Sequence, residues 1–163
     1  MGADILEKIR ALLKQHNVNY ALLEHGHVHS SQDAASVRGT KIEQAAKALV
    51  LKEKKTGILV MFVVAGDRRL DLRKIKKEVL RVKNLSLASP EEVLERTTCT
   101  VGSVPPFGQL FDMPMYFDRH LQETKGTIVF SAGTHHHSIK LKTEDYLSVA
   151  KPIIAAYSSP SSR

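Results

Sequence analysis

An uninterrupted apolar run, "ILVMFVVA" at 58–65, constrains the fold of this chain more than any other feature. It is far too short to cross a bilayer. Apolar and β-branched residues without polar alternation are typical of a strand that is buried on both faces. A second run, "KALVLKE" at 47–53, precedes it across the turn-like "KKTG". The two runs therefore predict a β-hairpin in the core.

The other predicted elements are short, and strands outnumber helices. Apolar residues between 5 and 13 recur at helical spacing and predict an amphipathic first helix. Thr40 followed by Glu43 is a capping-box pattern that predicts a short helix ending near residue 46. Ser89 before Pro90 predicts another helix start, and Thr143 predicts the cap of a last helix that Pro152 bends or interrupts. The remaining predictions are a strand at 18–25, a short helix near 31–37, a helix over 68–83, and strands in "NLSLAS", "MPMYFD", "GTIVFSAG" and "SIKLK".

These elements predict one α+β domain over residues 1–157, with a mixed, mostly antiparallel sheet and helices packed outside it. No repeat of 20–50 residues is visible. The tail "SSPSSR" at 158–163 is expected to be disordered.

Charge and targeting signals limit the classes of function that this chain could have. The net charge is +7, which favours polyanionic partners. Basic residues concentrate in "RRLDLRKIKKEVLRVK" at 68–83, where a solvated helix face and a nucleic-acid contact surface both remain open. The N-terminus lacks a secretory pattern, so we expect a cytoplasmic protein that does not enter membranes. The single cysteine, Cys99, excludes an intramolecular disulfide and is expected to be a buried thiol.

Histidines gather at two places, in "HGHVH" at 25–29 and in "HHH" at 135–137. Alternation would place three imidazoles on one side of an extended segment, an arrangement that suits Zn or Ni. Carboxylates or cysteines at a recognisable spacing are missing, so histidines flanking a pocket are favoured over a metal site. Nucleotide-binding glycine loops and the hydrolase elbow are absent.

A lysine and two small-residue loops remain as candidates for chemistry. Lys47 opens the apolar run "ALVL", where it marks either a surface edge or a group that points into a pocket. Gly102 lies in "VGSVPPFG", and Ser131 and Gly133 lie in "FSAG". Loops of small residues let a ligand approach the backbone, whose free N–H groups can hold an oxyanion.

In order along the chain, these pieces resemble the YbaK/ProRS-associated editing domain family. The matching pieces are "EH", "RGT...AAKALVLK", "DRRLDLRKI", "LASPEEV", "VGSVPPFG", "FSAG" and "SIKLKTEDYL". Each piece is weak alone, but their order from residue 25 to about residue 152 is specific. "RGTKIEQAAKALVLK" with "KTEDYLSVAKP" is most similar to the YeaK-like branch of freestanding trans-editing factors that act on seryl- and threonyl-tRNAs.

The resemblance implies a barrel-like sheet with surrounding helices and an aminoacyl-tRNA deacylase without a cofactor or metal. The signature lysine of the family falls on Lys47, its loop glycine on Gly102, and the serine after its late strand on Ser131, which implies catalytic roles for all three. Ser103 and Ser138 depart from the family pattern, so a cysteinyl or prolyl-type specificity is not carried over.

The same resemblance implies a substrate pocket and a tRNA surface. The residues expected in the pocket are His25, Thr40, Ser103, Gly133, His135 and Ser138. The residues expected to contact the acceptor end of tRNA are Arg69, Arg73, Lys76 and Lys77. An aminoacyl-tRNA synthetase is a further candidate partner.

Three alternatives stay open from the sequence. The amino acid removed could be another small one, alanine or cysteine. The chain could be a noncatalytic tRNA-binding or synthetase-associated module, which its charge alone would explain. It could also be a histidine-dependent metalloprotein.

Overall fold

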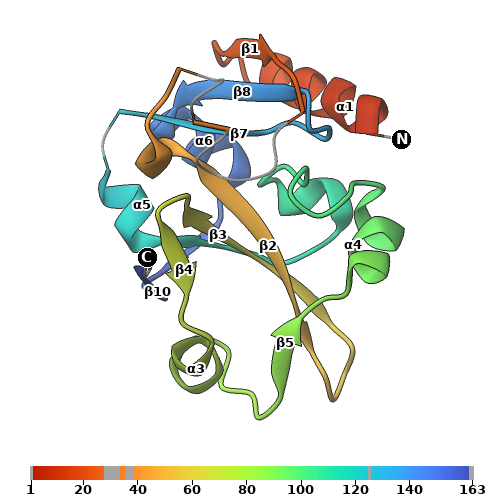
Figure 1. The fold of residues 1–163 in the computed structure, drawn as a ribbon, viewed down its shortest axis with the longest axis vertical. Coiled ribbons are helices and arrows are strands. Elements are labelled where there is room, and N and C mark those ends of the chain that lie inside the picture. The colour runs from red at the N-terminus through yellow and green to blue at the C-terminus, as the bar shows by residue number, and fades with distance from the viewer. Residues whose placement is uncertain (1, 28–33, 36–38, 125, 162–163) are drawn as a thin grey trace.

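The predicted hairpin lies at the centre of the computed structural model, which describes residues 2–27, 34–35, 39–124 and 126–161 (Figure 1). Its strands β2 (Ala46–Glu53) and β3 (Leu59–Ala65) pair antiparallel, from Ala46 opposite Ala65 to Lys52 opposite Leu59. Every residue of β3 is buried, so the expectation of a strand covered on both faces is confirmed.

Five strands form the main sheet, in the order β5-β2-β3-β6-β9. The added strands are β5 (Leu85–Leu87), β6 (Met115–Asp118) and β9 (Ile153–Ala155). β5 pairs antiparallel with β2, whereas β6 pairs parallel with β3 and β9 pairs parallel with β6. The parallel pairs need long crossovers, and the segments between them carry the helices α4 (Pro90–Thr97), α5 (Arg119–Glu123) and α6 (Thr143–Ala150).

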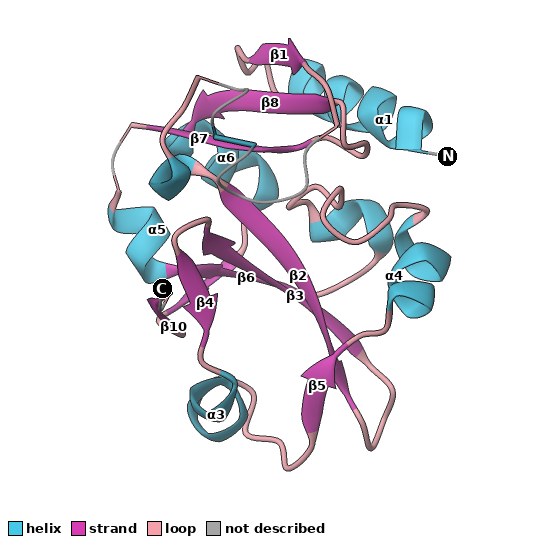
Figure 2. Ribbon diagram, in the orientation of Figure 1, coloured by secondary structure: helices cyan, strands magenta, loops and turns pink. Residues whose placement is uncertain are grey.

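A second sheet of three antiparallel strands lies at one end of the main sheet (Figure 2). Its order is β1-β8-β7, with β1 (Ala21–Glu24), β8 (His137–Lys142) and β7 (Thr127–Ser131). Helix α1 (Gly2–Gln15) contributes its apolar stripe to the core beside this sheet. An isolated parallel bridge between Ala45 and Val129 links the two sheets.

The barrel-like closure expected from the resemblance is wrong. In the described part of the chain, the outer strands β5 and β9 of the main sheet do not pair with each other. The small sheet meets the main sheet through the bridge at Ala45 rather than through a continuous ladder. A single α+β domain with mixed strand pairing and outer helices is confirmed.

Two predicted helix caps differ from the structure. The turn after Thr40 is a short 3₁₀ helix, η1 (Ile42–Gln44), and the backbone N–H of Lys41 donates to Oε1 of Gln44. Thr40 therefore precedes the cap, and its buried Oγ1 has no partner within the described residues. Helix α6 begins at Thr143 itself, whose hydroxyl is likewise buried and unpaired in that part of the chain.

Other helix predictions agree with the structure. Ser89 and Glu92 form the predicted reciprocal capping box at the start of α4, with bonds of 2.9 and 3.1 Å. Helix α6 ends at Ala150, its cap residue Lys151 lies in the left-handed region, and the residues that follow Pro152 form β9. The predicted helix near 31–37 lies largely outside the described residues, although Ala34 and Ala35 are helical and buried.

The basic run is not one helix. Arg68–Leu70 forms the strand β4, and the helical part consists of α3 (Leu72–Lys74) and the π-helical turn η2 (Ile75–Val79). Asp71 separates the strand from the helix and caps the latter, because its Oδ1 accepts from the N–H of Lys74 at 3.0 Å.

The predicted disorder of the tail is wrong for its described part. Ser158–Pro160 forms the strand β10, which pairs antiparallel with β4. Composition suggested disorder, but a free edge at β4 provides hydrogen-bond partners for the tail that composition cannot reveal.

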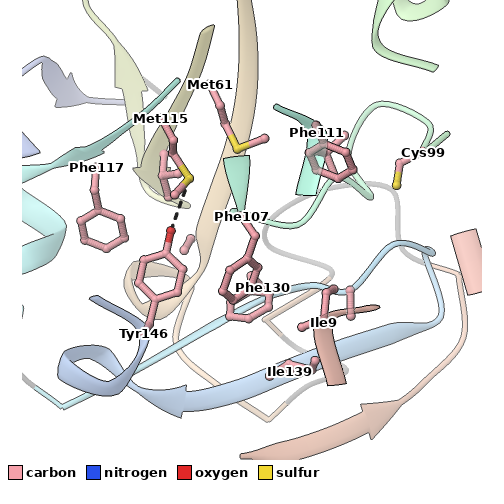
Figure 3. Close-up of a cluster of buried hydrophobic side chains, with 14 of the residues drawn as sticks. Ile9, Met61, Cys99, Phe107, Phe111, Met115, Phe117, Phe130, Ile139 and Tyr146 are labelled. Atoms are coloured by element: carbon pink, nitrogen blue, oxygen red, sulfur yellow. Dashed lines mark hydrogen bonds between the residues drawn. The ribbon is translucent and has the colours of Figure 1, made fainter. Parts of the chain in front are cut away.

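Aromatic and sulfur-containing side chains fill the main core (Figure 3). The rings of Phe107 and Phe130 meet edge to face at 5.4 Å, and the hydroxyl of Tyr146 donates to the carbonyl oxygen of Pro106 at 2.5 Å. Cys99 lies in this core, where burial raises the pKa of its thiol. That environment fits the predicted buried thiol and disfavours a thiolate nucleophile. Across the described residues, no helix is both long and apolar enough to cross a membrane.

Candidate functional site

Strand β2 divides the surroundings of the site into two faces. Ala46, Ala48 and Val50 contact the main core. Because side chains alternate along a strand, Lys47 and Leu51 point to the opposite face. Leu51 lies there in a second apolar cluster. Lys47 thus occupies the polar end of a face whose other end is a packed core.

The Lys47 side chain is half-buried and turned toward β4. Its Nζ donates to the main-chain oxygen of Arg68 at 3.2 Å. Burial lowers the pKa of the ammonium, and the negative charge of Asp67 opposes that shift. A partly desolvated cation is well suited to an anionic or polarisable substrate group, because interactions strengthen where water is displaced.

The bridge at Ala45 brings Ser131 to the face of Lys47. Ala45 pairs in parallel with Val129, and the next positions that point to the same face are Lys47 and Ser131. Ser131 pairs in turn with Ser138 on β8. Two of the three predicted catalytic residues, from opposite halves of the chain, therefore share one face.

His25 joins this polar face from the end of β1. Its Nε2 hydrogen-bonds Oγ of Ser138 at 2.8 Å, and its main-chain N–H donates to the oxygen of His136 at 2.9 Å. Ser138, where the family pattern differs, is completely buried and is held by this histidine. The predicted pocket residues His25 and Ser138 are thus in direct contact.

The Gly102 loop and the loop after β7 are joined by hydrogen bonds. The N–H of Gly133 donates to the oxygen of Ser103 at 3.0 Å, and Oγ1 of Thr100 bonds Nε2 of His135 at 2.9 Å. Gly102 has a φ of +91°, and a Cβ at this position would lie 3.2 Å from Cε1 of His135. Both the left-handed backbone and the close histidine ring favour glycine here.

Ser103 differs from the expectation of a side chain that faces the substrate. It is buried, and its hydroxyl donates to the main-chain oxygen of Thr100 at 2.8 Å. This bond stabilises the turn that presents Gly102.

The histidines contact each other and nearby hydroxyl groups. His27 stacks on His135 with ring centroids 4.5 Å apart and meets His136 edge-on at 5.7 Å. His137 bonds Oγ1 of Thr134 at 2.7 Å. Among the residues that the structure describes, no group of three or more His, Cys, Asp or Glu is arranged to hold a metal ion; His29 lies outside them.

The expected tRNA contacts lie beside the same sheet face. Arg69, Arg73 and Lys77 are exposed, and Lys76 is half-buried. Their segment is anchored by Ile75, which packs in the second apolar cluster with Leu51. The basic surface therefore begins at the strand whose main chain binds Lys47.

Two polar residues near Lys47 and the C-terminal segment were not predicted from the sequence. Asp67 lies in the turn between β3 and β4, beside Lys47, and its Oδ1 is buried without a partner within the described chain. Asp118 is buried at the end of β6 and binds the C-terminal segment. A Gly-Asp pair directly after a buried strand was a usable signal for Asp67, whereas the partner of Asp118 is remote in sequence.

Comparison with known proteins identifies a family and two relatives for this chain. Residues 25–149 match the family model described as an aminoacyl-tRNA editing domain. The multifunctional Ser/Thr-tRNA deacylase ProXp-y of Escherichia coli K12 is 36% identical over 153 residues, covering 93% of this chain and 91% of that protein. The prolyl-tRNA editing protein ProX of Acetoanaerobium sticklandii is 27% identical over 125 residues, covering 74% of this chain and 76% of that protein.

Two solved structures share the fold. A crystal structure of a hypothetical protein superposes with a TM-score of 0.82 at 24% identity, covering 93% of this chain and 99% of that one. A candidate trans-editing enzyme for prolyl tRNA synthetase superposes with a TM-score of 0.79 at 25% identity, covering 95% of this chain and 97% of that one.

Proposed function

The chain belongs to the aminoacyl-tRNA editing domain family and is an aminoacyl-tRNA deacylase, and we propose that it removes serine or threonine from mischarged tRNAs as a freestanding factor. The relative from E. coli that covers most of the chain is a Ser/Thr-tRNA deacylase, which supports this specificity. The observation that carries the proposal is the shared face of Lys47 and Ser131 beside the Gly102 loop.

The chemistry requires little beyond this site. An aminoacyl ester is already activated, so attack by water needs neither a strong nucleophile nor a metal. The attack builds negative charge on the carbonyl oxygen of the ester, which backbone N–H groups near Gly102 would stabilise. Lys47 would position the substrate by holding its terminal phosphate or by polarising the ester.

Hydroxyl-bearing side chains favour a substrate that carries a hydroxyl group. Ser131 is paired with Ser138, and Ser138 is bonded to His25. A site that hydrogen-bonds a substrate hydroxyl rejects analogues that lack it, because its own polar groups would be left unpaired. The alternative substrates are tRNAs that carry alanine or cysteine. A preference of the enzyme for amino acids with a hydroxyl group would distinguish serine and threonine from these alternatives.

The basic segment would hold the acceptor end of the tRNA. Arg69 lies on β4, whose main chain binds Lys47, and Arg73, Lys76 and Lys77 extend the positive charge along the helical segment that follows. Phosphate contacts of this kind bind tRNA largely without regard to sequence. A synthetase is proposed as a further partner that would supply newly mischarged tRNA, in the cytoplasm where translation takes place.

A deacylation panel tests the proposed activity and specificity together. Seryl-, threonyl-, alanyl- and cysteinyl-tRNAs are incubated with the protein, and ester loss is followed above the rate without enzyme. We expect the fastest loss for seryl- or threonyl-tRNA and a loss of activity in Lys47→Ala. An intact ester throughout the panel would leave only a tRNA-binding module, and full activity in Lys47→Ala would remove that residue from the mechanism.

A pair of charge reversals tests the tRNA surface. Arg73→Glu should weaken tRNA binding and flatten its dependence on salt, because phosphate contacts release counterions. Lys8→Glu on α1 is the matched control, since α1 and α3 lie at opposite ends of the molecule (Figure 1). Equal weakening by both variants would indicate a general charge effect instead of a contact surface.

A further inference from the structure

The main-chain oxygen that binds Lys47 belongs to a residue that is itself anchored to the C-terminal strand. Nζ of Lys47 donates to the oxygen of Arg68. The guanidinium of Arg68 donates through Nε to Oγ of Ser158 at 2.7 Å and through a terminal nitrogen to the oxygen of Ser158 at 3.1 Å. The position of Lys47 thus depends on a residue 111 positions away in sequence (158 − 47 = 111).

Ser158 is in turn fixed by a buried carboxylate. Its hydroxyl donates to Oδ2 of Asp118, while the N–H of Tyr157 donates to Oδ1 at 3.2 Å. Asp118 is only 1% exposed. Buried carboxylates are costly unless they are hydrogen-bonded, so this pair of bonds holds the strand firmly.

The C-terminal segment also holds both ends of β4. Pro160 lies opposite Arg68, and Ser158 lies opposite Leu70. The N–H of Ser161 donates to the oxygen of Asp67 at 3.1 Å, and the N–H of Asp71 donates to the oxygen of Tyr157 at 2.8 Å. In the described structure β10 is the strand that pairs with β4 (Figure 1). Without β10, β4 would have no strand partner to set the position of the Arg68 carbonyl.

We propose that the C-terminal strand is a positioning element for the editing reaction, in which Ser158, held by Asp118, fixes Arg68 so that its carbonyl aims the ammonium of Lys47. This inference rests on the proposed function insofar as Lys47 acts on the substrate. Lysine has a long flexible side chain, and a fixed acceptor lowers the entropic cost of keeping its charge in one place. Asp118, Ser158 and Arg68 are positioning residues, since they act through Lys47.

Neighbouring serines of β10 provide a matched test. Ser158→Ala removes the hydroxyl that links Asp118 to Arg68, whereas Ser159→Ala removes a hydroxyl that accepts from the exposed Arg69 at 3.5 Å. We expect kcat on seryl- or threonyl-tRNA to fall about tenfold in Ser158→Ala with little change in KM, because a displaced catalytic group acts on the chemical step. Ser159→Ala should match the parent, and Ser158→Thr, which keeps a hydroxyl, should restore most of the rate.

The rates are measured well below the melting temperature of each variant, so that loss of folded protein does not enter kcat. Equal rates in Ser158→Ala and the parent would overturn the proposal. Equal losses in Ser158→Ala and Ser159→Ala would also overturn it, because the effect would then not depend on the link to Arg68.

A double-mutant cycle separates this inference from the proposed function. In a Lys47→Ala background, Ser158→Ala should have no further effect if it acts through Lys47. An undiminished loss in that background would overturn the positioning role even if the protein is a deacylase.

A readout without substrate covers the case in which no tested tRNA is deacylated. The protein is acylated at trace level with an amine-reactive reagent and analysed by peptide mass spectrometry, which reports the accessibility of each lysine. The exposed Lys8 serves as internal reference. Ser158→Ala should raise the labelling of Lys47 relative to Lys8, and Ser159→Ala should not. Unchanged labelling of Lys47 in Ser158→Ala would contradict the structural link itself.

Discussion

The two ends of one face of β2 have opposite tasks. At one end Leu51 is fully buried with Phe62, Ile75 and Tyr157. At the other end Lys47 is half-buried and bonded to a main-chain oxygen. Four positions along β2 (51 − 47 = 4) therefore separate a packed core from a polar site. The difference teaches that one side of a single strand can contribute both to the core and to a functional site, provided that different segments pack against it along its length.

A close backbone approach at the entrance of β2 directs the segment that covers the two ends. Gly66 follows β3, and its N–H donates to the oxygen of Ala45 at 2.9 Å. A Cβ on Gly66 would lie 2.6 Å from the oxygen of Ile42. Only glycine lets the turn after β3 press this closely against the entrance of β2. The turn then directs Asp67 and Arg68 over Lys47, while the helical part of the segment continues over Leu51.

The largest effects are expected when the residue at either end of this face is replaced by alanine. Lys47→Ala should lower kcat/KM on the order of 100-fold, as loss of one group that stabilises developing charge does elsewhere, with little loss of stability. Leu51→Ala should cost about 2–5 kcal/mol of unfolding free energy through the cavity that it leaves, with normal activity for each folded molecule. Denaturant melts and deacylation rates on both variants check the pair. A Leu51→Ala protein that is folded but inactive would contradict the division of tasks.

A glycine pair gives the next largest effect and tests the loop half of the site. Gly102 and Gly57 both have positive φ, but a Cβ at Gly57 would meet nothing within 4 Å. Alanine at either position should cost roughly 1–2 kcal/mol of backbone strain. Gly102→Ala should in addition push His135 away and lower kcat about tenfold, whereas Gly57→Ala should keep its activity. Similar kcat values for the two variants would remove the Gly102 loop from the site.

Local patterns predicted the parts of the fold whose causes are local. The buried strand predicted from the apolar run agrees with the structure from Leu59 to Ala65, and the Ser89 cap agrees as well. Ile58, the first residue of that run, lies outside the strand and is exposed. Thr40 and Thr143 are of a residue type that often caps helices, but their hydroxyls are buried without a hydrogen-bond partner in the described chain. Tertiary packing placed the cap positions at other residues. Local pattern alone could not separate these cases.

The site was predicted as a list of residues but not as a geometry. Order along the chain selected Lys47, Gly102 and Ser131, yet the register that puts Lys47 and Ser131 on one face comes from the bridge between Ala45 and Val129. The tail was misjudged for the same reason: its strand exists because β4 offers an edge, a long-range property that composition does not contain.

The charge beside Lys47 gives a smaller and sharper test. Asp67 raises the pKa of Lys47 against the larger lowering effect of burial. If the protonated ammonium is the active form, the rate falls as pH rises through that pKa. Asp67→Asn removes the opposing charge, lowers the pKa further and should move the alkaline fall in kcat to lower pH. The control is Asp112→Asn, an exposed aspartate in a left-handed position that asparagine tolerates.

The rates in this test are corrected for spontaneous ester hydrolysis, which increases with pH. An alkaline limb that stays in place or moves to higher pH in Asp67→Asn would mean that another group titrates. A rate that rises with pH through the pKa of Lys47 would mean that its neutral amine is the active form.

The smallest expected effect concerns Lys52, a second lysine of the same strand, whose role in stability is compared with the role of Lys47. Nζ of Lys52 lies 2.5 Å from Oε2 of Glu92, at the start of α4. Hydrogen bonds from Lys52 and from the N–H of Ser89 lower the pKa of Glu92 to about 2. Because the folded pKa lies below the ordinary value, this pairing stabilises the protein above about pH 4.5, and the contribution is lost as pH falls toward 2.

Glu92→Gln should therefore reduce stability slightly at neutral pH and make it less dependent on pH between about 4.5 and 2. Thermal melts across that range measure the effect, and deacylation at neutral pH should be unchanged. A deacylation defect in Glu92→Gln would show that β2 transmits changes from its structural lysine to Lys47, and the two ends of the strand would then not be independent.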